Sequence, residues 1–194
     1  MTIKVLLLDI GGIFFSPCWR NKGIREVSDK LHVDLNDFKT ALDTYKNPFY
    51  TGNMTEDKYW ANVLDKLGVD NIKPSDIGIL YRNYVKPIPE AINLLPRLSS
   101  KYTLLSFNNS SKEWMDYRIK IASLDKYFSE FFTSGYIGCT KSDINMYENV
   151  TQSYNREELF YLDDNEDYVS RAKIACGIDG KKYVDIEDLL QLIT

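Results

Sequence analysis

The chain has 194 residues and a formal net charge of −4, from 24 basic and 28 acidic side chains. Apolar residues make up 44% of the sequence and charged residues 27%, a balance typical of a globular protein with a buried core. The acidic charge argues against a protein that binds nucleic acid through a basic face. No apolar run approaches the roughly 20 residues of a membrane span, and the start of the chain lacks the pattern of a signal peptide, so we expect a cytoplasmic protein without a membrane partner.

Cysteine and histidine are too scarce for several kinds of site. The three cysteines, Cys18, Cys139 and Cys176, are odd in number, far apart and include no CxxC pair. A disulfide framework or a zinc–cysteine site is therefore not expected. The single histidine, His32, cannot supply a multi-histidine metal site, and we interpret it as a surface or packing residue.

The first expected element is a strand. The apolar run Ile3–Leu8 is unbroken and is followed by Asp9, which is typical of a strand buried on both faces in a parallel sheet.

Residues 16–87 show helical spacing of apolar residues and no convincing strand. The stripes are Ile24, Val27 and Leu31; Leu35, Phe38 and Leu42; and Trp60, Val63, Leu64 and Leu67. Pro48 and Gly52 interrupt this stretch, and Lys86-Pro-Ile-Pro89 resembles a linker. We predict a helical cap over residues 16–87, inserted between the first strand and the rest of a core domain formed by residues 1–15 and 88–194.

The remainder of the chain alternates between strands and helices. Apolar runs at Tyr102–Ser106 and Leu159–Leu162 predict two strands, and weaker runs at Glu130–Thr133 and Lys173–Cys176 predict two more. Helical stripes lie between them: Ala91, Leu94, Leu95 and Leu98; then Ile144, Tyr147, Val150 and Tyr154. This alternation predicts an α/β fold with a doubly wound parallel sheet.

Polar side chains follow the predicted core strands. Asp9 follows the first strand, Ser106 ends the second, and Asp163 and Asp164 follow Leu159–Leu162. In open α/β sheets the ligand crevice lies at the carboxyl ends of the strands, so these groups should converge. Three carboxylates brought together favour a cation, and hard oxygen ligands suit magnesium. Lys141 precedes a predicted helix and can supply a fixed positive charge.

The order and setting of these groups resemble the haloacid dehalogenase (HAD)-like hydrolase superfamily, most closely its magnesium phosphatases with a helical cap. The resemblance spans the chain in four motifs, Leu8–Phe14 (LDIGGIF), Leu104–Asn109 (LLSFNN), Lys141–Tyr147 (KSDINMY) and Tyr161–Asp167 (YLDDNED). It is nearest to the branch of sugar-1-phosphate phosphatases, which is similar to the phosphatase domain of soluble epoxide hydrolases. The resemblance implies a Rossmann-like core with an inserted α-helical cap.

The resemblance also implies a reaction and a cofactor. Asp9 would be the nucleophile that forms an aspartyl-phosphate with a small phosphorylated metabolite, such as a sugar phosphate. Mg²⁺ would be held by Asp9, the backbone carbonyl of Gly11 and Asp164, while Asp163 would orient Lys141 or a metal-bound water. The residues expected to bind the phosphate are Ser106, Asn108, Asn109 and Lys141.

The sequence departs from the family pattern at three positions. Gly11 stands where these phosphatases usually have a second aspartate that acts as general acid, Phe107 replaces an asparagine, and Ser142 replaces a proline. Two other functions therefore stay open: a 2-haloacid dehalogenase, which uses the same aspartate without a metal, and a non-catalytic binding or regulatory protein. The acidic pair Asp163-Asp164 favours the metal-dependent phosphatase. The sequence leaves open the oligomeric state and the cap residues that select the substrate.

Overall fold

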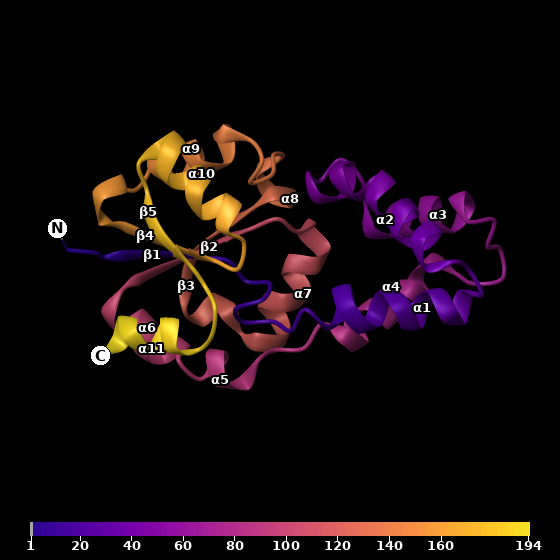
Figure 1. The fold of residues 1–194 in the computed structure, drawn as a ribbon, viewed down its shortest axis with the longest axis horizontal. Helices are drawn as coiled ribbons and strands as arrows, with labels where there is room; N and C mark the ends of the chain where they lie inside the picture. The colour runs from indigo at the N-terminus through magenta and orange to yellow at the C-terminus, as the bar shows by residue number, and fades with distance from the viewer. Residues whose placement is uncertain (1) are drawn as a thin grey trace.

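The computed structural model describes residues 2–194 and contains a five-stranded parallel sheet in the order β3-β2-β1-β4-β5 (Figure 1). The strands are β1 (Val5–Leu8), β2 (Thr103–Asn108), β3 (Phe128–Thr133), β4 (Leu159–Asp163) and β5 (Asp179–Lys182). β1 is central and pairs with β2 on one side and with β4 on the other. The predicted parallel α/β sheet is confirmed.

Helices cover both faces of this sheet. They are α5 (Pro89–Ile92), α6 (Leu95–Lys101), α7 (Lys112–Ala122), α8 (Ser134–Ile137), α9 (Ile144–Thr151), α10 (Glu166–Cys176) and α11 (Glu187–Ile193). In Figure 1, α9 and α10 lie on one face, and α5, α6 and α11 lie on the other. Within residues 2–194, no helix combines the length and the apolar character needed to cross a bilayer.

The alternation of side chains along β1 explains this two-sided covering. Leu6 and Leu8 belong to a buried cluster that includes Leu98 of α6, whereas Leu7 belongs to a second buried cluster that includes Val150 of α9. Every residue of β1 is buried, which is why its sequence is an unbroken apolar run rather than an alternating one.

Between β1 and α5 the chain forms the helical insertion (residues 16–87), which lies to one side of the sheet (Figure 1). Its elements are η1 (Trp19–Gly23), α1 (Ile24–Leu31), α2 (Leu35–Tyr50), α3 (Glu56–Lys66) and α4 (Pro74–Tyr84). The side chains of Asp34 and Thr55 cap the amino ends of α2 and α3 by accepting backbone N–H bonds. The backbone N–H of Ile88 donates to the carbonyl of Phe14 (2.8 Å), so the chain leaves and rejoins the core at one place.

The helical insertion packs against the core through α7. The Trp114 ring of α7 stacks on the Tyr81 ring of α4, with centroids 3.8 Å apart and planes 15° apart. Its indole N–H also donates to Oε1 of Glu56 at the start of α3 (3.0 Å), and Glu56 pairs with Arg82. Trp114 therefore satisfies a buried carboxylate of the helical insertion and extends its aromatic core.

Two predictions about individual elements are wrong. Lys173–Cys176 is the last turn of α10 rather than a strand: Ala172 and Cys176 face the core while Ile174 is 86% exposed. The fifth strand is β5, a polar and largely exposed edge strand without an apolar signal. The second error concerns Pro48, which does not interrupt the helix, because α2 continues through it to Tyr50.

Candidate active site

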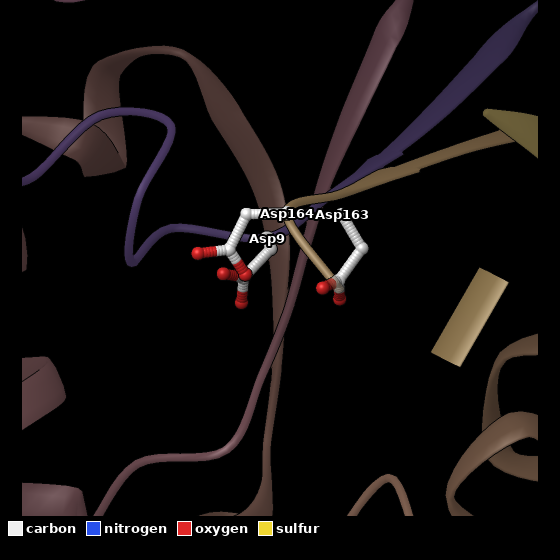
Figure 2. A group of neighbouring side chains, drawn as sticks. All are labelled: Asp9, Asp163 and Asp164. Atoms are coloured by element: carbon white, nitrogen blue, oxygen red, sulfur yellow. The ribbon is translucent and has the colours of Figure 1, made fainter. Parts of the chain in front are cut away.

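The carboxyl ends of the two central strands bring three aspartates together. Asp9 directly follows β1, Asp163 ends β4 and Asp164 follows it. One carboxylate oxygen from each lies within 4.8 Å of the others. Figure 2 shows the three carboxyl groups directed to the same side of the strand ends. The backbone N–H of Asp9 donates to the carbonyl of Leu162 (2.9 Å), which extends the pairing of β1 with β4 into the site.

Lys141 is the cationic partner of two of these carboxylates. Its Nζ lies 2.8 Å from Oδ1 of Asp9 and 2.6 Å from Oδ2 of Asp163. Two contacts fix its backbone: its N–H donates to Oδ1 of Asn109 (2.8 Å), and its carbonyl accepts from the Tyr147 hydroxyl (3.0 Å). The lysine is thus held between the end of β2 and helix α9.

These ionic contacts are almost completely removed from water. The side chains of Lys141, Asp163 and Asp9 are 2%, 1% and 10% exposed. Burial raises the pKa of Asp9 to about 7, against the lowering effect of Lys141 and with a smaller raising effect from Asp163. Burial also acts to lower the pKa of Lys141, but the adjacent charges of Asp9 and Asp163 outweigh it and raise that pKa. Lys141 therefore stays charged.

The two aspartates of β4 differ in what they already bind. Asp163 accepts hydrogen bonds from Lys141, from the Tyr161 hydroxyl and from the Asn165 backbone N–H. Among residues 2–194, the ion pair of Asp164 is a loose one with the exposed Arg20, at 3.8 Å. Asp164 therefore has the free oxygen lone pairs that a cation needs, whereas Asp163 is committed to holding Lys141.

The two glycines after Asp9 serve different purposes. Gly12 has a positive φ of 91°, and a Cβ there would lie 2.3 Å from Oδ2 of Asp164, so only glycine lets β1 approach this aspartate. Gly11 is not so constrained. A Cβ at Gly11 would lie 3.7 Å from Nη2 of Arg20 and 3.8 Å from Oδ2 of Asp9, which are ordinary contacts.

The end of β2 differs from the prediction. Ser106 lies inside the strand, is fully buried and does not line the cavity, because β2 continues two residues further than its apolar run suggests. The residues that reach the cavity are Asn108 and Asn109. The Asn108 amide nitrogen lies 3.2 Å from Oγ1 of Thr133, and its Oδ1 is buried without a hydrogen-bond partner within residues 2–194.

These groups open into a cavity of about 330 Å³ between the core and the helical insertion. Asp9, Gly11, Asn108, Asn109, Lys141, Asp163 and Asp164 line it from the core, as do Trp114, Arg118 and Tyr168. Trp19, Arg20, Lys46, Tyr50 and Tyr81 line it from the helical insertion. The residues after the strand ends and Lys141 had a sequence signal, whereas most of the others are placed by helices whose faces cannot be oriented from spacing alone.

Together these groups define what the site can do chemically. The carboxylate oxygens of Asp9 and Asp164 suit a hard divalent cation. Lys141 holds Oδ1 of Asp9 and leaves Oδ2 without a hydrogen bond among the described residues, free to act as a nucleophile. The site can therefore bind an anion beside a cation and attack it with a carboxylate.

Comparison with solved structures finds proteins that share the fold of this chain, whereas the comparisons of sequence find no match. No family model matches the chain, and no curated protein sequence is significantly similar to it. A HAD family enzyme from Bacteroides thetaiotaomicron, in complex with magnesium and inorganic phosphate, superposes with a TM-score of 0.83 at 19% identity, covering 99% of this chain and 100% of that one. A predicted HAD-like family hydrolase from Porphyromonas gingivalis gives a TM-score of 0.80 at 17% identity, covering 100% and 98%. The L-2-haloacid dehalogenase from Xanthobacter autotrophicus gives 0.67 at 15% identity, covering 98% and 82%. The chain has the fold of the HAD-like hydrolases.

Proposed function

We propose that this protein is a magnesium-dependent phosphohydrolase of the HAD-like superfamily, which acts on a small phosphorylated metabolite through an aspartyl-phosphate on Asp9. The observation that carries the proposal is the buried arrangement of Lys141 between Asp9 and Asp163, with Asp164 beside them at the mouth of a cavity. The magnesium and phosphate in the Bacteroides relative support the same chemistry.

In the proposed reaction, Oδ2 of Asp9 attacks phosphorus and the bond to the ester oxygen breaks. The leaving oxygen takes the bonding electron pair and, because Gly11 offers no carboxylic acid, a proton from water. A water molecule then attacks phosphorus, the bond between phosphorus and Asp9 breaks, inorganic phosphate is released and the proton of that water passes to solvent. Lys141 holds the attacking carboxylate through Oδ1 and offsets the negative charge of the phosphoryl group.

The donor set fits Mg²⁺. Asp9, the Gly11 backbone carbonyl and Asp164 would hold the ion, which supplies charge neutralisation and alignment to the attack of a carboxylate on a dianion. Asp164 suits this role because its ion pair with Arg20, the one it makes within the described part of the chain, is loose. Asp163 would orient Lys141, in keeping with its three hydrogen bonds.

The two asparagines at the end of β2, Asn108 and Asn109, would have different roles at the phosphate. Asn109 accepts from the Lys141 backbone and its amide nitrogen lies 3.2 Å from the Tyr168 hydroxyl, so it positions the lysine. Asn108 has the unpartnered buried atom. Exchanging its amide oxygen and nitrogen would let the Thr133 hydroxyl donate to the oxygen and free an NH₂ group for a phosphate oxygen. We assign phosphate binding to Asn108 in place of Ser106.

The helical insertion would act as the cap, over residues 16–87, on a core of residues 1–15 and 88–194. It contributes Trp19, Arg20, Lys46, Tyr50 and Tyr81 to the cavity. A cap that closes on the strand ends excludes water and strengthens the electrostatic interactions inside.

The direct test is hydrolysis of p-nitrophenyl phosphate and acetyl phosphate with and without Mg²⁺. We expect turnover that requires Mg²⁺ and is lost in Asp9→Asn, because an amide of nearly the same shape is not a competent nucleophile. Asp167→Asn is a matched control, since Asp167 belongs to the same acidic motif but is exposed and does not line the cavity. Turnover by Asp9→Asn at the wild-type rate would contradict the proposal.

A dehalogenase is the second candidate, because the Xanthobacter relative shares the fold and Gly11 removes the usual general acid. It predicts chloride release from 2-chloropropionate without metal. The free carboxylate of Asp164 beside Asp9 favours the phosphatase. A non-catalytic protein is the third candidate, and it predicts phosphate binding without turnover of either ester.

A further inference from the structure

Arg118 is a cation of the cavity without an acidic partner. Its Nη1 donates to Oγ of Ser110 and its Nη2 to the Tyr81 hydroxyl, both at 2.8 Å. No carboxylate of residues 2–194 lies within 4.0 Å of its guanidinium. Its Nε–H is buried and has no hydrogen-bond partner among the same residues. Only two of its five N–H donors are therefore used by the protein.

The position of this guanidinium is fixed from both sides of the cavity. Ser110 comes from the core and Tyr81 from the helical insertion, and each is 1% exposed. The guanidinium carbon also lies 5.9 Å from the centre of the Phe15 ring. Arg118 is half-buried, and a partly buried cation held by neutral groups favours a counter-ion; a planar fork held in place is also preorganised to bind carboxylate or phosphate oxygens.

The three carboxylates of the cavity do not supply that counter-ion, because each already faces another cation. Lys141 is paired with Asp9 and Asp163, and Arg20 lies against Asp164. Lys46, the remaining cation, forms its ion pair with Asp43, which does not line the cavity. Four cationic side chains face three carboxylates in a volume of about 330 Å³, so the cavity has an excess of positive charge before any divalent cation binds.

We propose that the substrate carries a second anionic group, a carboxylate or a second phosphate, and that Arg118 binds it. The inference rests on the proposed function, since it names the substrate class of that site. The phosphoryl group that reacts lies at Asp9, and the second anionic group lies at the guanidinium held by Ser110 and Tyr81. The cavity volume is near the lower end of the roughly 300–1,000 Å³ of ligand pockets, so the two groups belong to one small metabolite.

The test uses phosphonates, which bind but are not hydrolysed, with calorimetry in the presence of Mg²⁺. One pair is 3-phosphonopropionate and propylphosphonate, which differ in the carboxylate. The other pair is propane-1,3-diphosphonate and propylphosphonate, which differ in the second phosphonate. We expect one doubly anionic ligand to bind at least tenfold more tightly than propylphosphonate, and the pair that shows this identifies the second group.

The ratio of the dissociation constant of propylphosphonate to that of the doubly anionic ligand should fall close to one in Arg118→Gln. The ratio is used because a general loss of binding would weaken both ligands equally. Tyr81→Phe should lower it severalfold, because it removes the hydroxyl that holds Nη2. Arg97→Gln, an exposed arginine of α6 outside the cavity, should leave the ratio unchanged. Circular dichroism would check that each variant is folded.

Equal affinities for all three phosphonates in the wild-type protein, or no binding of any of them, would overturn the inference, as would an unchanged ratio in folded Arg118→Gln. The p-nitrophenyl phosphate assay reports separately on the proposed function. Mg²⁺-dependent turnover of that ester together with equal phosphonate affinities would reject the second anionic group and leave the phosphatase in place.

Discussion

Replacing Lys141 by methionine tests the central electrostatic feature of the site. The substitution keeps an unbranched side chain that is one atom shorter and removes its charge, so the buried carboxylates of Asp9 and Asp163 lose a partner at 2.8 and 2.6 Å. Breaking a buried ion pair by removing one partner costs about 3–5 kcal/mol in free energy of unfolding, because the remaining charge is left desolvated. For a domain of this length the melting temperature should fall by roughly 6–20 °C.

The assay is urea denaturation of the metal-free protein in EDTA. Lys173→Met is a matched control: Nζ of Lys173 lies 2.6 Å from Asp179, but the two side chains are 68% and 69% exposed. An exposed pair contributes about 0–1 kcal/mol, so this variant should be nearly as stable as the wild type. Both substitutions remove an ion pair with an N–O distance of 2.6 Å, buried at Lys141 and exposed at Lys173, and Lys141 also loses its contact with Asp9.

The sign of the pH dependence gives a second readout. Beside Lys141, burial already raises the pKa of Asp9 to about 7, and removing the lysine should raise that pKa further, so the folded variant keeps Asp9 protonated over a range in which the folded wild type has lost the proton. The stability deficit of Lys141→Met should therefore be largest above pH 7 and shrink as the pH falls to 7. Adding Mg²⁺ should reduce it as well. A deficit no larger than that of Lys173→Met, or one that is constant with pH, would refute the reasoning.

Three further predictions concern the metal and the leaving group. Asp164→Asn should weaken Mg²⁺ binding and show partial recovery of activity at high Mg²⁺; an unchanged Mg²⁺ dependence would remove Asp164 from the ligands. Because burial raises the pKa of Asp9 to about 7, Mg²⁺ must displace a proton below that pH, so its dissociation constant by calorimetry should rise roughly tenfold per unit from pH 7 to pH 5; a constant value would contradict this. A Cβ at Gly11 makes only ordinary contacts and Gly11→Asp restores a proton donor, so kcat/KM for glycerol phosphate should rise at least about tenfold, with little change for p-nitrophenyl phosphate. Arg20 beside the new carboxylate should keep its pKa low and hold the gain near that lower limit, and an equal effect on both esters would argue for another proton donor.

The core strands could be predicted because a strand buried on both faces consists of consecutive apolar residues, which are visible in the sequence. Unbroken runs of this kind occur at β1 and β4, and each stops at an aspartate that the structure places in the site. The end of β2 is harder to predict because two buried polar residues, Ser106 and Asn108, belong to the strand. β5 gives no signal because an exposed edge strand needs no apolar side chains.

The cavity wall could not be predicted for a different reason. Arg118 lines the cavity only because Tyr81, 37 residues earlier in the chain, is brought to it by α4 packing on α7. Its role depends on the distance between two helices of separate segments. Neither the spacing nor the residue type reports that distance, so an arginine here is indistinguishable in sequence from a surface arginine.

The indole of Trp114 has a consequence for engineering the protein. Because this core residue completes the aromatic packing of the helical insertion and satisfies Glu56, residues 16–87 are not an exchangeable module. Grafting them onto a related core would remove the Trp114 N–H from Glu56 and the Trp114 ring from the stack on Tyr81 unless α7 were transplanted too. Chimaeras made at the boundaries 15/16 and 87/88 should therefore express poorly, whereas those that also carry Lys112–Ala122 should yield soluble protein.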